Sequence, residues 1–365
     1  MSKRRFSVLG AGPGGLAMAA HLVATGGRVC VYNRGAERAE SIRSGGGIRV
    51  SGELEGTYPV DEVTCDIRRA ADHAEVLFVV VPAYAHADIA AAVAQHLRDD
   101  HIVILCPGRT GGALEFSRVV QERKPGCGAV VVETQTILHT CRMANEGGVE
   151  IFAIKRNVPL AAFPSTKTSH VLEILSPDFP QFSAGEDVLE TSMGNVGAIL
   201  HPAPTLLNVG WIEALRAQFL YYYEGITPSV GDLLESLDRE RMAVAAALGT
   251  RAISVCEWLC RTYGATGNRL HDAIQSNPAY RGIYAPQSVN HRYLYEDVPT
   301  GLVPISSLGD LASVETPHID TIVDLASAVC GVDFRRRGRT IQSLHLEGLT
   351  IDDLHRHVEN GPATS

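Results

Sequence analysis

Short runs of this sequence that are apolar at almost every position restrict its fold more than any other feature. They are VLFVVVP at 76–82, IVILCPG at 102–108 and AVVVE at 129–133. A strand without alternating polar residues is covered on both faces, as in a parallel sheet with helices on each side. Residues 6–9 and 29–32 are also predicted as strands, with a helix over 16–24 between them. This spacing indicates βαβ units, and therefore an α/β fold with a doubly wound parallel sheet.

The sequence pattern becomes helical near residue 188. Thr227-Pro228 is typical of a helix start, and Gly249 can end that helix. The apolar residues that share one stripe of this helix are Leu233, Leu237, Val244 and Leu248. Further helices are expected near 252–263 and 316–330. The chain has 365 residues, which suits two domains. We predict an N-terminal Rossmann domain over 1–187 and a C-terminal all-α domain over 188–365.

Composition excludes several classes of partner. The sequence has 32 Lys and Arg against 41 Asp and Glu, a net charge of −9. A protein with this balance has no global positive field to hold nucleic acid or an anionic membrane. The one basic run is Arg335, Arg336, Arg337 and Arg339. We expect it to be a solvated loop, with a local phosphate site as the alternative.

The sequence also predicts the compartment in which the protein is found. Residues 191–212 lack charged side chains, but they contain two prolines, three glycines and His201. A buried helix that lines a site explains them better than a membrane span, and the glycines and prolines after the basic N-terminus exclude a signal peptide. The eight cysteines are dispersed without the spacing of metal ligands. We therefore expect a soluble protein of the reducing cytoplasm, with no metal site.

A glycine-rich turn lies between the first predicted strand and the first helix. It reads Gly10-Ala11-Gly12-Pro13-Gly14-Gly15. In such turns the first glycine permits a tight turn, the second lets the backbone approach a pyrophosphate, and the last permits close packing of the helix on the strand. The N–H groups at the start of the helix then face the phosphates. We predict that Gly10, Gly12, Pro13, Gly14 and Gly15 bind a dinucleotide.

The end of the second predicted strand distinguishes the two nicotinamide cofactors. NAD sites usually carry Asp or Glu there, whereas this chain has Asn33-Arg34, with Arg38 one helical turn further on. Asn33 can donate to a 2′-phosphate and Arg34 can pair with it. We therefore favour NADP over NAD, although Arg34 and Arg38 as plain surface residues remain an alternative. Pro82 and His86 follow a strand at its carboxyl end and are assigned to the cofactor as well; for His86, a surface position at a helix start is equally open.

Two segments of the helical half carry residues suited to catalysis. Hydride transfer needs a proton donor near the reacting carbon and groups that anchor the charges of the substrate. The segment GNVGAILHPAPTLLN contains His201, and NHRYLYEDVPTGLVP at 290–304 contains Arg292, Glu296 and Asp297. A single histidine in an apolar segment is more often structural than functional, so this pattern alone decides little.

These segments resemble those of the opine dehydrogenases, the octopine/nopaline dehydrogenase family, and especially bacterial members that act on pyruvate and norvaline-like amino acids. The resemblance runs nearly end to end. It is carried by VVPAYAHADIA, CPGRTGGALEF, HPAPTLLN, YYYEGITPSVG, NPAYRGI and RYLYEDVPTGLVP. This set is far more specific than the glycine motif. The family is commonly NAD-dependent, and Asn33-Arg34 departs from that pattern.

The resemblance implies a set of site residues. His201 and Asp297 match a catalytic His–Asp pair, and Arg292 matches an arginine that holds a substrate carboxylate. By analogy, Thr134 donates to the keto acid. Asn195 contacts nicotinamide or substrate, or else caps a helix.

The resemblance also implies the reaction. A pyruvate-like α-keto acid and the amino group of an amino acid or amine would condense to an imine, which is reduced to a secondary amine. Two other functions stay open: a ketopantoate-reductase-like 2-oxoacid reductase, and a non-catalytic module that senses NADP. Arg109 either anchors a second carboxylate or is a surface residue. An apolar helical domain favours a homodimer.

Overall fold

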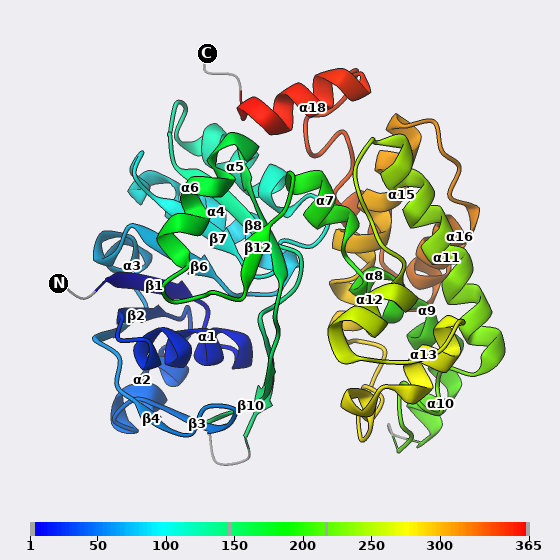
Figure 1. Cartoon of the computed structure of the whole chain (residues 1–365), viewed down its shortest axis with the longest axis horizontal. Coiled ribbons are helices and arrows are strands. Elements are labelled where there is room, and N and C mark those ends of the chain that lie inside the picture. The colour runs from blue at the N-terminus through cyan, green and yellow to red at the C-terminus, as the bar shows by residue number, and fades with distance from the viewer. Residues whose placement is uncertain (1–3, 145–147, 216–217, 363–365) are drawn as a thin grey trace. The chain divides into compact units, whose positions relative to one another are not determined.

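The computed structural model describes residues 4–144, 148–215 and 218–362, and they form two compact units (Figure 1). The sheet unit contains the described residues up to Gly108, then Gly112–Thr191, and those from Arg356 onward. The helical unit contains Arg109–Gly111 and Ser192–His355. The chain therefore passes between the units at several points instead of one.

The sheet unit is built on an eight-stranded sheet with the order β12-β11-β8-β7-β6-β1-β2-β5. Its strands are β1 (Arg5–Leu9), β2 (Arg28–Tyr32), β5 (Glu62–Thr64), β6 (Val76–Val79), β7 (Ile102–Leu105), β8 (Val130–Thr134), β11 (Val158–Phe163) and β12 (Phe182–Ala184). Neighbouring strands are parallel except β8 and β11. From β5 to β8 this is the Rossmann strand order, which reverses between β1 and β6. The predicted fold class is confirmed.

Helices cover both faces of this sheet, as its uniformly apolar strands require. Every residue of β6 and β7 is buried. The helices of the sheet unit are α1 (Pro13–Ala24), α2 (Ala36–Ser44), α3 (Ile67–His73), α4 (His86–Val93), α5 (Gly112–Arg123) and α6 (Thr168–Leu175). The Ser7 hydroxyl donates to the Ala70 carbonyl at 2.6 Å and so fixes α3 to β1.

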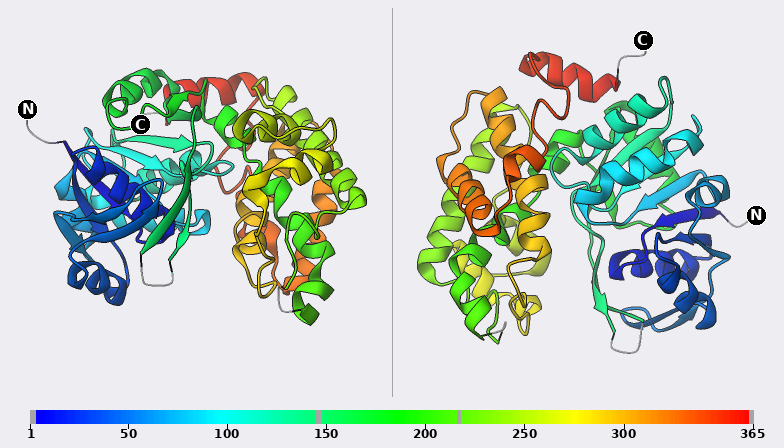
Figure 2. Two further views of the ribbon diagram at one scale, coloured as in Figure 1. Left: turned by 60° about the horizontal axis from the view of Figure 1, so that its bottom comes forward. Right: turned by 180° about the vertical axis from the view of Figure 1, so that it is seen from behind.

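A smaller sheet of four strands lies beside α1 (Figures 1 and 2). It consists of β3 (Ile48–Gly52), β4 (Gly56–Tyr58), β9 (His139–Met143) and β10 (Val149–Ile154). His21 of α1 and His139 of β9 are hydrogen-bonded through their ring nitrogens at 2.9 Å. Burial, then His21 and Lys155, lower the pKa of His139 to about 3. The pair is therefore neutral at physiological pH, and α1 is held between two sheets.

The helical unit consists mainly of helices, and α11, α15 and α16 lie side by side in it (Figure 1). Its helices are α8 (Gly197–Leu200), α9 (Pro202–Leu207), α10 (Val209–Leu215), α11 (Pro228–Ala247), α12 (Val255–Tyr263), α13 (Leu270–Ser276), α14 (Arg292–Tyr295), α15 (Val303–Leu311), α16 (Pro317–Cys330) and α17 (Phe334–Arg337). Thr227 caps α11 as its sequence indicated. The predicted apolar stripe was wrong at Leu233, which is only half-buried, because Leu234 takes the core position.

The connection between the units differs from the single predicted boundary at 188. Helix α7 (Val188–Met193) spans the junction. Its first turn stays with the sheet unit because the Thr191 hydroxyl donates to Glu133 at 2.6 Å. Near the other end of the chain, α18 (Ile351–Asn360) also spans a junction. The hydrogen bond from Thr191 to Glu133 joins residues 58 positions apart, so no local sequence pattern reveals the junction at α7.

The structure tests the predictions for the arginine run at 335–339 and for the uncharged segment 191–212. The interpretation of the arginine run as a solvated loop was wrong for Arg339, which is buried and donates from Nη1 to the Thr110 carbonyl at 2.9 Å. Arg335, Arg336 and Arg337 are exposed as expected, but they lie in helix α17 and not in a loop, and Arg335 pairs with Asp320 and Asp324. The uncharged segment 191–212 is divided among α7, α8, α9 and α10. No helix among the described residues has the length and apolar character that a membrane crossing needs.

Candidate active site

The glycine turn of the sheet unit fits the phosphates of a dinucleotide. Gly10 has a φ of +120°, and a Cβ there would lie 2.4 Å from the Val80 carbonyl oxygen. A Cβ on Gly15 would lie 1.9 Å from the Gly10 oxygen, so both positions require glycine. A Cβ on Gly12 would meet nothing within 4 Å, so the backbone there is open to approach. Pro13 begins α1, whose N-terminal N–H groups face this opening.

Other predicted cofactor residues lie at the carboxyl ends of neighbouring strands. Pro82 and His86 follow β6, which pairs with β1 at the point where the strand order reverses. The surface alternative for His86 was wrong, because its side chain is fully buried at the start of α4. Next to β2, the Asn33 amide donates to the Gly35 carbonyl at 2.8 Å, and Arg34 is exposed. Arg38 is exposed as well, and its Nη1 lies 3.6 Å from the sulfur of Met143.

Thr134 ends β8 in the same unit and is almost fully buried. Its hydroxyl lies 3.3 Å from the Leu105 carbonyl and 3.0 Å from that of Thr136. The Thr134 hydroxyl therefore donates to backbone carbonyls in this structure, and a substrate oxygen would have to replace one of these acceptors.

A histidine–aspartate pair forms the centre of the helical unit. His201 lies between α8 and α9, and its Nδ1 is 2.8 Å from Oδ2 of Asp297. Asp297 precedes a π-helical turn over Val298–Leu302, a feature that often marks functional sites. The His201 carbonyl accepts from the hydroxyls of Tyr221 and Thr205, at 2.6 and 2.8 Å. The histidine is thus fixed at both its side chain and its backbone.

The charge of Asp297 determines what this pair can do. Its side chain is 0% exposed. Burial would raise the pKa of Asp297, but Arg109 and then His201 lower it to about 2. The carboxylate is therefore ionised at neutral pH. It orients the ring of His201, holds a proton on Nδ1 and leaves Nε2 for proton transfer.

Two tyrosines complete the surroundings of the histidine. The ring of Tyr293 stacks on that of His201, with centroids 4.2 Å apart and planes 13° from parallel. The Tyr222 hydroxyl lies 3.2 Å from Nε2 of His201. Burial raises the pKa of Tyr222 well above its usual value, so it stays a hydrogen-bond donor. Both tyrosines belong to tyrosine-containing segments that were visible in the sequence, but nothing local marked them as neighbours of a histidine.

The remaining predicted residues of the helical unit differ in exposure. The side chain of Arg292 is 54% exposed, and its Nη1 lies 3.9 Å from Oε2 of Glu296. Asn195 is buried; its Oδ1 accepts from Arg109 at 3.3 Å and its Nδ2 donates to Thr110 at 3.2 Å. The surface interpretation of Arg109 was wrong, because its side chain is only 12% exposed and pairs with Glu296 and Asp297.

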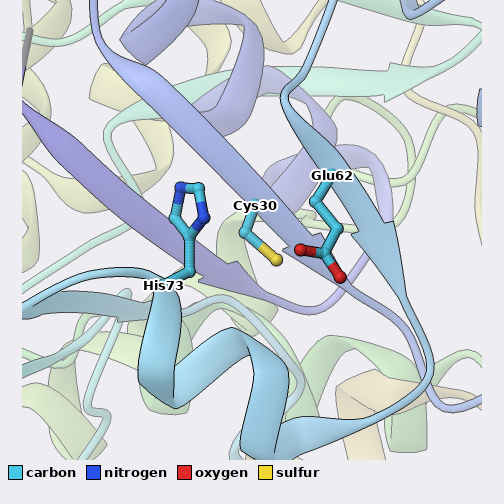
Figure 3. Close-up of side chains that lie close together, drawn as sticks. All are labelled: Cys30, Glu62 and His73. Atoms are coloured by element: carbon cyan, nitrogen blue, oxygen red, sulfur yellow. The ribbon is translucent and has the colours of Figure 1, made fainter.

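A separate cluster in the sheet unit contains residue types that bind metals (Figure 3). Cys30 and Glu62 are paired across β2 and β5, and His73 ends α3. Nε of Arg69 lies 2.7 Å from the Glu62 carboxylate, and Nη2 of Arg5 lies 3.3 Å from Nδ1 of His73. Burial and the nearby Glu62 raise the pKa of Cys30 to about 12. Guanidinium groups contact the Glu62 carboxylate and Nδ1 of His73, and the raised pKa keeps the Cys30 thiol protonated, so we assign no metal to the cluster.

Each unit of the chain matches a known family of oxidoreductases. The family described as NAD/NADP octopine/nopaline dehydrogenase, alpha-helical domain, matches residues 184–330. The family of NADP oxidoreductases described as coenzyme F420-dependent matches residues 5–106. An opine dehydrogenase of Arthrobacter sp. (strain 1C) is 44% identical over 98% of this chain and 100% of its own length.

Solved structures share the whole fold. Octopine dehydrogenase with NADH and L-arginine superposes with a TM-score of 0.79 at 21% identity, covering 99% of both chains. Yersinopine dehydrogenase with NADP⁺ bound superposes with a TM-score of 0.72 at 17% identity, covering 98% of both chains. At these identities the superpositions establish the fold.

Proposed function

Because this chain belongs to the opine dehydrogenase family, we propose that it joins an α-keto acid to an amino acid or amine with reducing equivalents from NADPH. The class of reaction, an NAD(P)H-dependent reductive condensation, follows from the family. The observation that carries the assignment to this chain is the hydrogen bond of 2.8 Å between His201 and a fully buried, ionised Asp297.

The reaction begins with condensation of the two substrates. The amine adds to the keto carbon, water leaves, and the product is an imine. Gly10–Gly15 and the residues at the ends of β2 and β6 would hold the nicotinamide cofactor, which when bound would supply the hydride for reduction of the imine carbon. The NADH and L-arginine bound by the related octopine dehydrogenase support this class of cofactor and amine.

His201 moves protons in this scheme. Condensation needs a proton delivered to the departing oxygen, and an imidazole ring can accept and donate protons as a general acid–base. Asp297 stabilises the ring when it is charged and keeps Nε2 as the reactive nitrogen. Tyr222 holds Nε2 through its hydroxyl until a substrate takes its place.

Arg292 is the residue we assign to a substrate carboxylate. The guanidinium of Arg292 is half-exposed, and its Cζ lies 5.9 Å from the centroid of the Tyr293 ring. That ring stacks on His201, so Tyr293 links Arg292 to the histidine. A planar guanidinium binds a carboxylate through two parallel hydrogen bonds. Thr134 and Asn195 stay assigned to the substrates as weaker contacts, because their polar groups already have protein partners.

The preference for NADPH rests on Asn33 and Arg34. An exposed arginine next to β2, without a carboxylate at the strand end, suits a 2′-phosphate. Arg34→Ala is expected to lower kcat/KM for NADPH by about 10–100-fold, the usual loss for a charge-assisted contact, while kcat/KM for NADH changes little. Steady-state kinetics with both cofactors measures the two values.

The matched control for Arg34 is Arg43→Ala. Arg43 is on α2 and pairs with Glu40, so the change removes an arginine from the same region without touching the strand end. Equal losses with NADPH and NADH in Arg34→Ala, or none with either, would contradict the proposed preference.

The reaction itself is tested by the loss of NADPH absorbance. We expect oxidation only when pyruvate and an L-amino acid or simple amine are both present, and faster oxidation of NADPH than of NADH. Oxidation with the keto acid alone would instead indicate a 2-oxoacid reductase. Tight cofactor binding without turnover of any pair would indicate a sensing module.

A cytoplasmic location and a homodimer stay predictions. The first rests on the dispersed cysteines and the second on the apolar helical domain.

A further inference from the structure

We propose that Arg109 is a positioning residue that keeps Asp297 charged, and thereby keeps an anion hydrogen-bonded to His201 while the enzyme works. The inference deepens the proposed function and rests on it, since it assigns a role in the same site. It differs from the earlier alternative, in which Arg109 itself anchors a carboxylate of the substrate.

The guanidinium of Arg109 is already occupied by protein groups. Its Nη1 lies 3.4 Å from Oδ1 of Asp297 and donates to Oδ1 of Asn195 at 3.3 Å. Its Nε donates to Oε1 of Glu296 at 3.4 Å. Oδ2 of Asp297 is the atom that faces His201. Arg109 and His201 therefore contact different oxygens of one carboxylate.

The charges in this cluster balance only when Arg109 is present. Glu296 and Asp297 are adjacent in the chain, and their side chains are 3% and 0% exposed. Arg109 is the enclosed cation between them, whereas Arg292 is half-exposed and therefore screened by water. Two adjacent buried carboxylates without a cation repel each other, and one of them takes up a proton.

The other groups that lower the pKa of Asp297 have smaller effects than Arg109. The titratable and charged groups that surround it are Arg109, His201, His291, Arg292, Tyr221, Tyr293 and Glu296. Burial raises the pKa of Tyr221 well above its usual value, so this tyrosine is neutral. Burial, then Arg292 and His201, lower the pKa of His291 to about 4. Burial raises the pKa of Asp297, and Arg109 is the strongest influence that lowers it.

The backbone around Arg109 is arranged for this contact. Arg109 has a φ of +62°, a left-handed conformation that costs a non-glycine residue free energy and therefore needs support. The Thr110 N–H donates to the Thr300 carbonyl at 3.0 Å, and the Gly111 N–H donates to the Ser192 hydroxyl at 2.9 Å. These bonds hold residues 109–111 within the helical unit.

A glycine provides the space for the side chain of Arg109. A Cβ on Gly197 would lie 2.5 Å from Nη1 of Arg109 and 3.2 Å from Oδ1 of Asp297. Glycine at this position therefore lets the guanidinium reach the carboxylate. The ion pair between Arg109 and Asp297 therefore also depends on Gly197, which belongs to a third segment of the chain.

The test compares Arg109→Met, Arg109→Lys and the double variant Arg109→Met/Glu296→Gln with the wild type, all as full-length protein. kcat and the KM for the keto acid are measured from pH 3.5 to 9. Loss of Arg109 raises the pKa of Asp297 by about 1–3 units, the usual effect of losing a nearby opposite charge. The ratio of Arg109→Met to wild-type kcat is therefore expected to fall as the pH is lowered, by about tenfold per unit below the new midpoint.

The other variants separate positioning from structure. Arg109→Lys keeps the cation and is expected to follow the wild-type pH profile. Removing the second carboxylate with Glu296→Gln is expected to move the acid limb of Arg109→Met back toward lower pH. A purely structural role predicts no such recovery. A large rise in the KM for the keto acid with an unchanged pH profile would show that Arg109 binds substrate, and would overturn the proposal.

A second readout does not depend on turnover. In protein labelled with ¹³C at aspartate carboxyls, the signal that Asp297→Asn removes is expected to stay nearly constant from pH 3.5 to 8 in the wild type and to titrate in Arg109→Met. Arg109→Gln is the substitute if Arg109→Met does not fold. A constant signal in a folded variant would overturn the proposal even if no substrate pair reacts, and a titrating signal without turnover would locate the failure in the proposed function instead.

Discussion

Replacing His201 with alanine is expected to lower kcat by about a hundredfold or more, the usual scale for a general acid–base, while the affinity for NADPH stays nearly unchanged. The physical reason is that the proposed proton-transfer residue and the proposed cofactor-binding residues belong to different units. His201 belongs to the helical unit, whereas the glycine turn and Asn33-Arg34 belong to the sheet unit. Rapid-quench or absorbance kinetics gives kcat, and cofactor fluorescence gives the dissociation constant.

His318→Ala is the matched control for this change. His318 belongs to the same unit and also pairs with a carboxylate, Glu240, at 2.6 Å, but it is exposed at the start of α16. Its loss is expected to leave kcat unchanged. Near-normal turnover in His201→Ala would remove His201 from the mechanism, and equal losses in both variants would indicate damage to the helical unit instead of lost proton transfer.

The second large effect is expected on stability. Arg241→Met should lower the free energy of unfolding by about 3–5 kcal/mol, the usual result of leaving one partner of a buried ion pair without compensation. Arg241 is fully buried in α11; its Nη2 donates to Asp238 at 2.6 Å and to the Ile253 carbonyl at 2.7 Å, and its Nη1 donates to the Met193 carbonyl. Urea denaturation followed by circular dichroism measures the change.

Two comparisons isolate the buried charge as the cause. Arg239→Met removes an exposed arginine from the same helix, whose Nη2 donates to the Ser236 hydroxyl at 2.8 Å, and is expected to change stability by less than about 0.5 kcal/mol. Adding Asp238→Asn to Arg241→Met removes the unpaired charge and is expected to recover part of the loss. A double variant less stable than Arg241→Met would contradict this explanation.

The parts of the fold that were predictable are those decided by neighbouring residues. The turn from Gly10 to Gly15 follows a strand and precedes a helix within a few positions, so neighbouring residues determine its conformation. The apolar runs at β6 and β7 specify burial on both faces without reference to the rest of the chain. In contrast, the choice between Leu233 and Leu234 depends on a helix phase of one residue, which the facing helices determine.

Polar residues were predicted less well, because their burial depends on partners far away in the sequence. Arg109 and Glu296 are 187 residues apart, and Arg339 reaches a carbonyl 229 residues away. An arginine in a glycine-rich loop looks exposed until such partners are known. His201 and Asp297 were paired in advance only because of a family resemblance, since 96 residues separate them.

The passage of Arg109–Gly111 into the helical unit has a consequence for protein engineering. A chimaera that took residues 1–187 from one family member and the remainder from another would exchange more than the cofactor site. It would place the arginine loop of one parent against the buried carboxylates of the other, although the fusion point is far from both in the sequence. The proposed NADPH preference is therefore better tested by point changes beside β2 than by exchange of halves, and a separately expressed helical half (residues 188–365) would lack Arg109 as the counter-ion of its buried carboxylates.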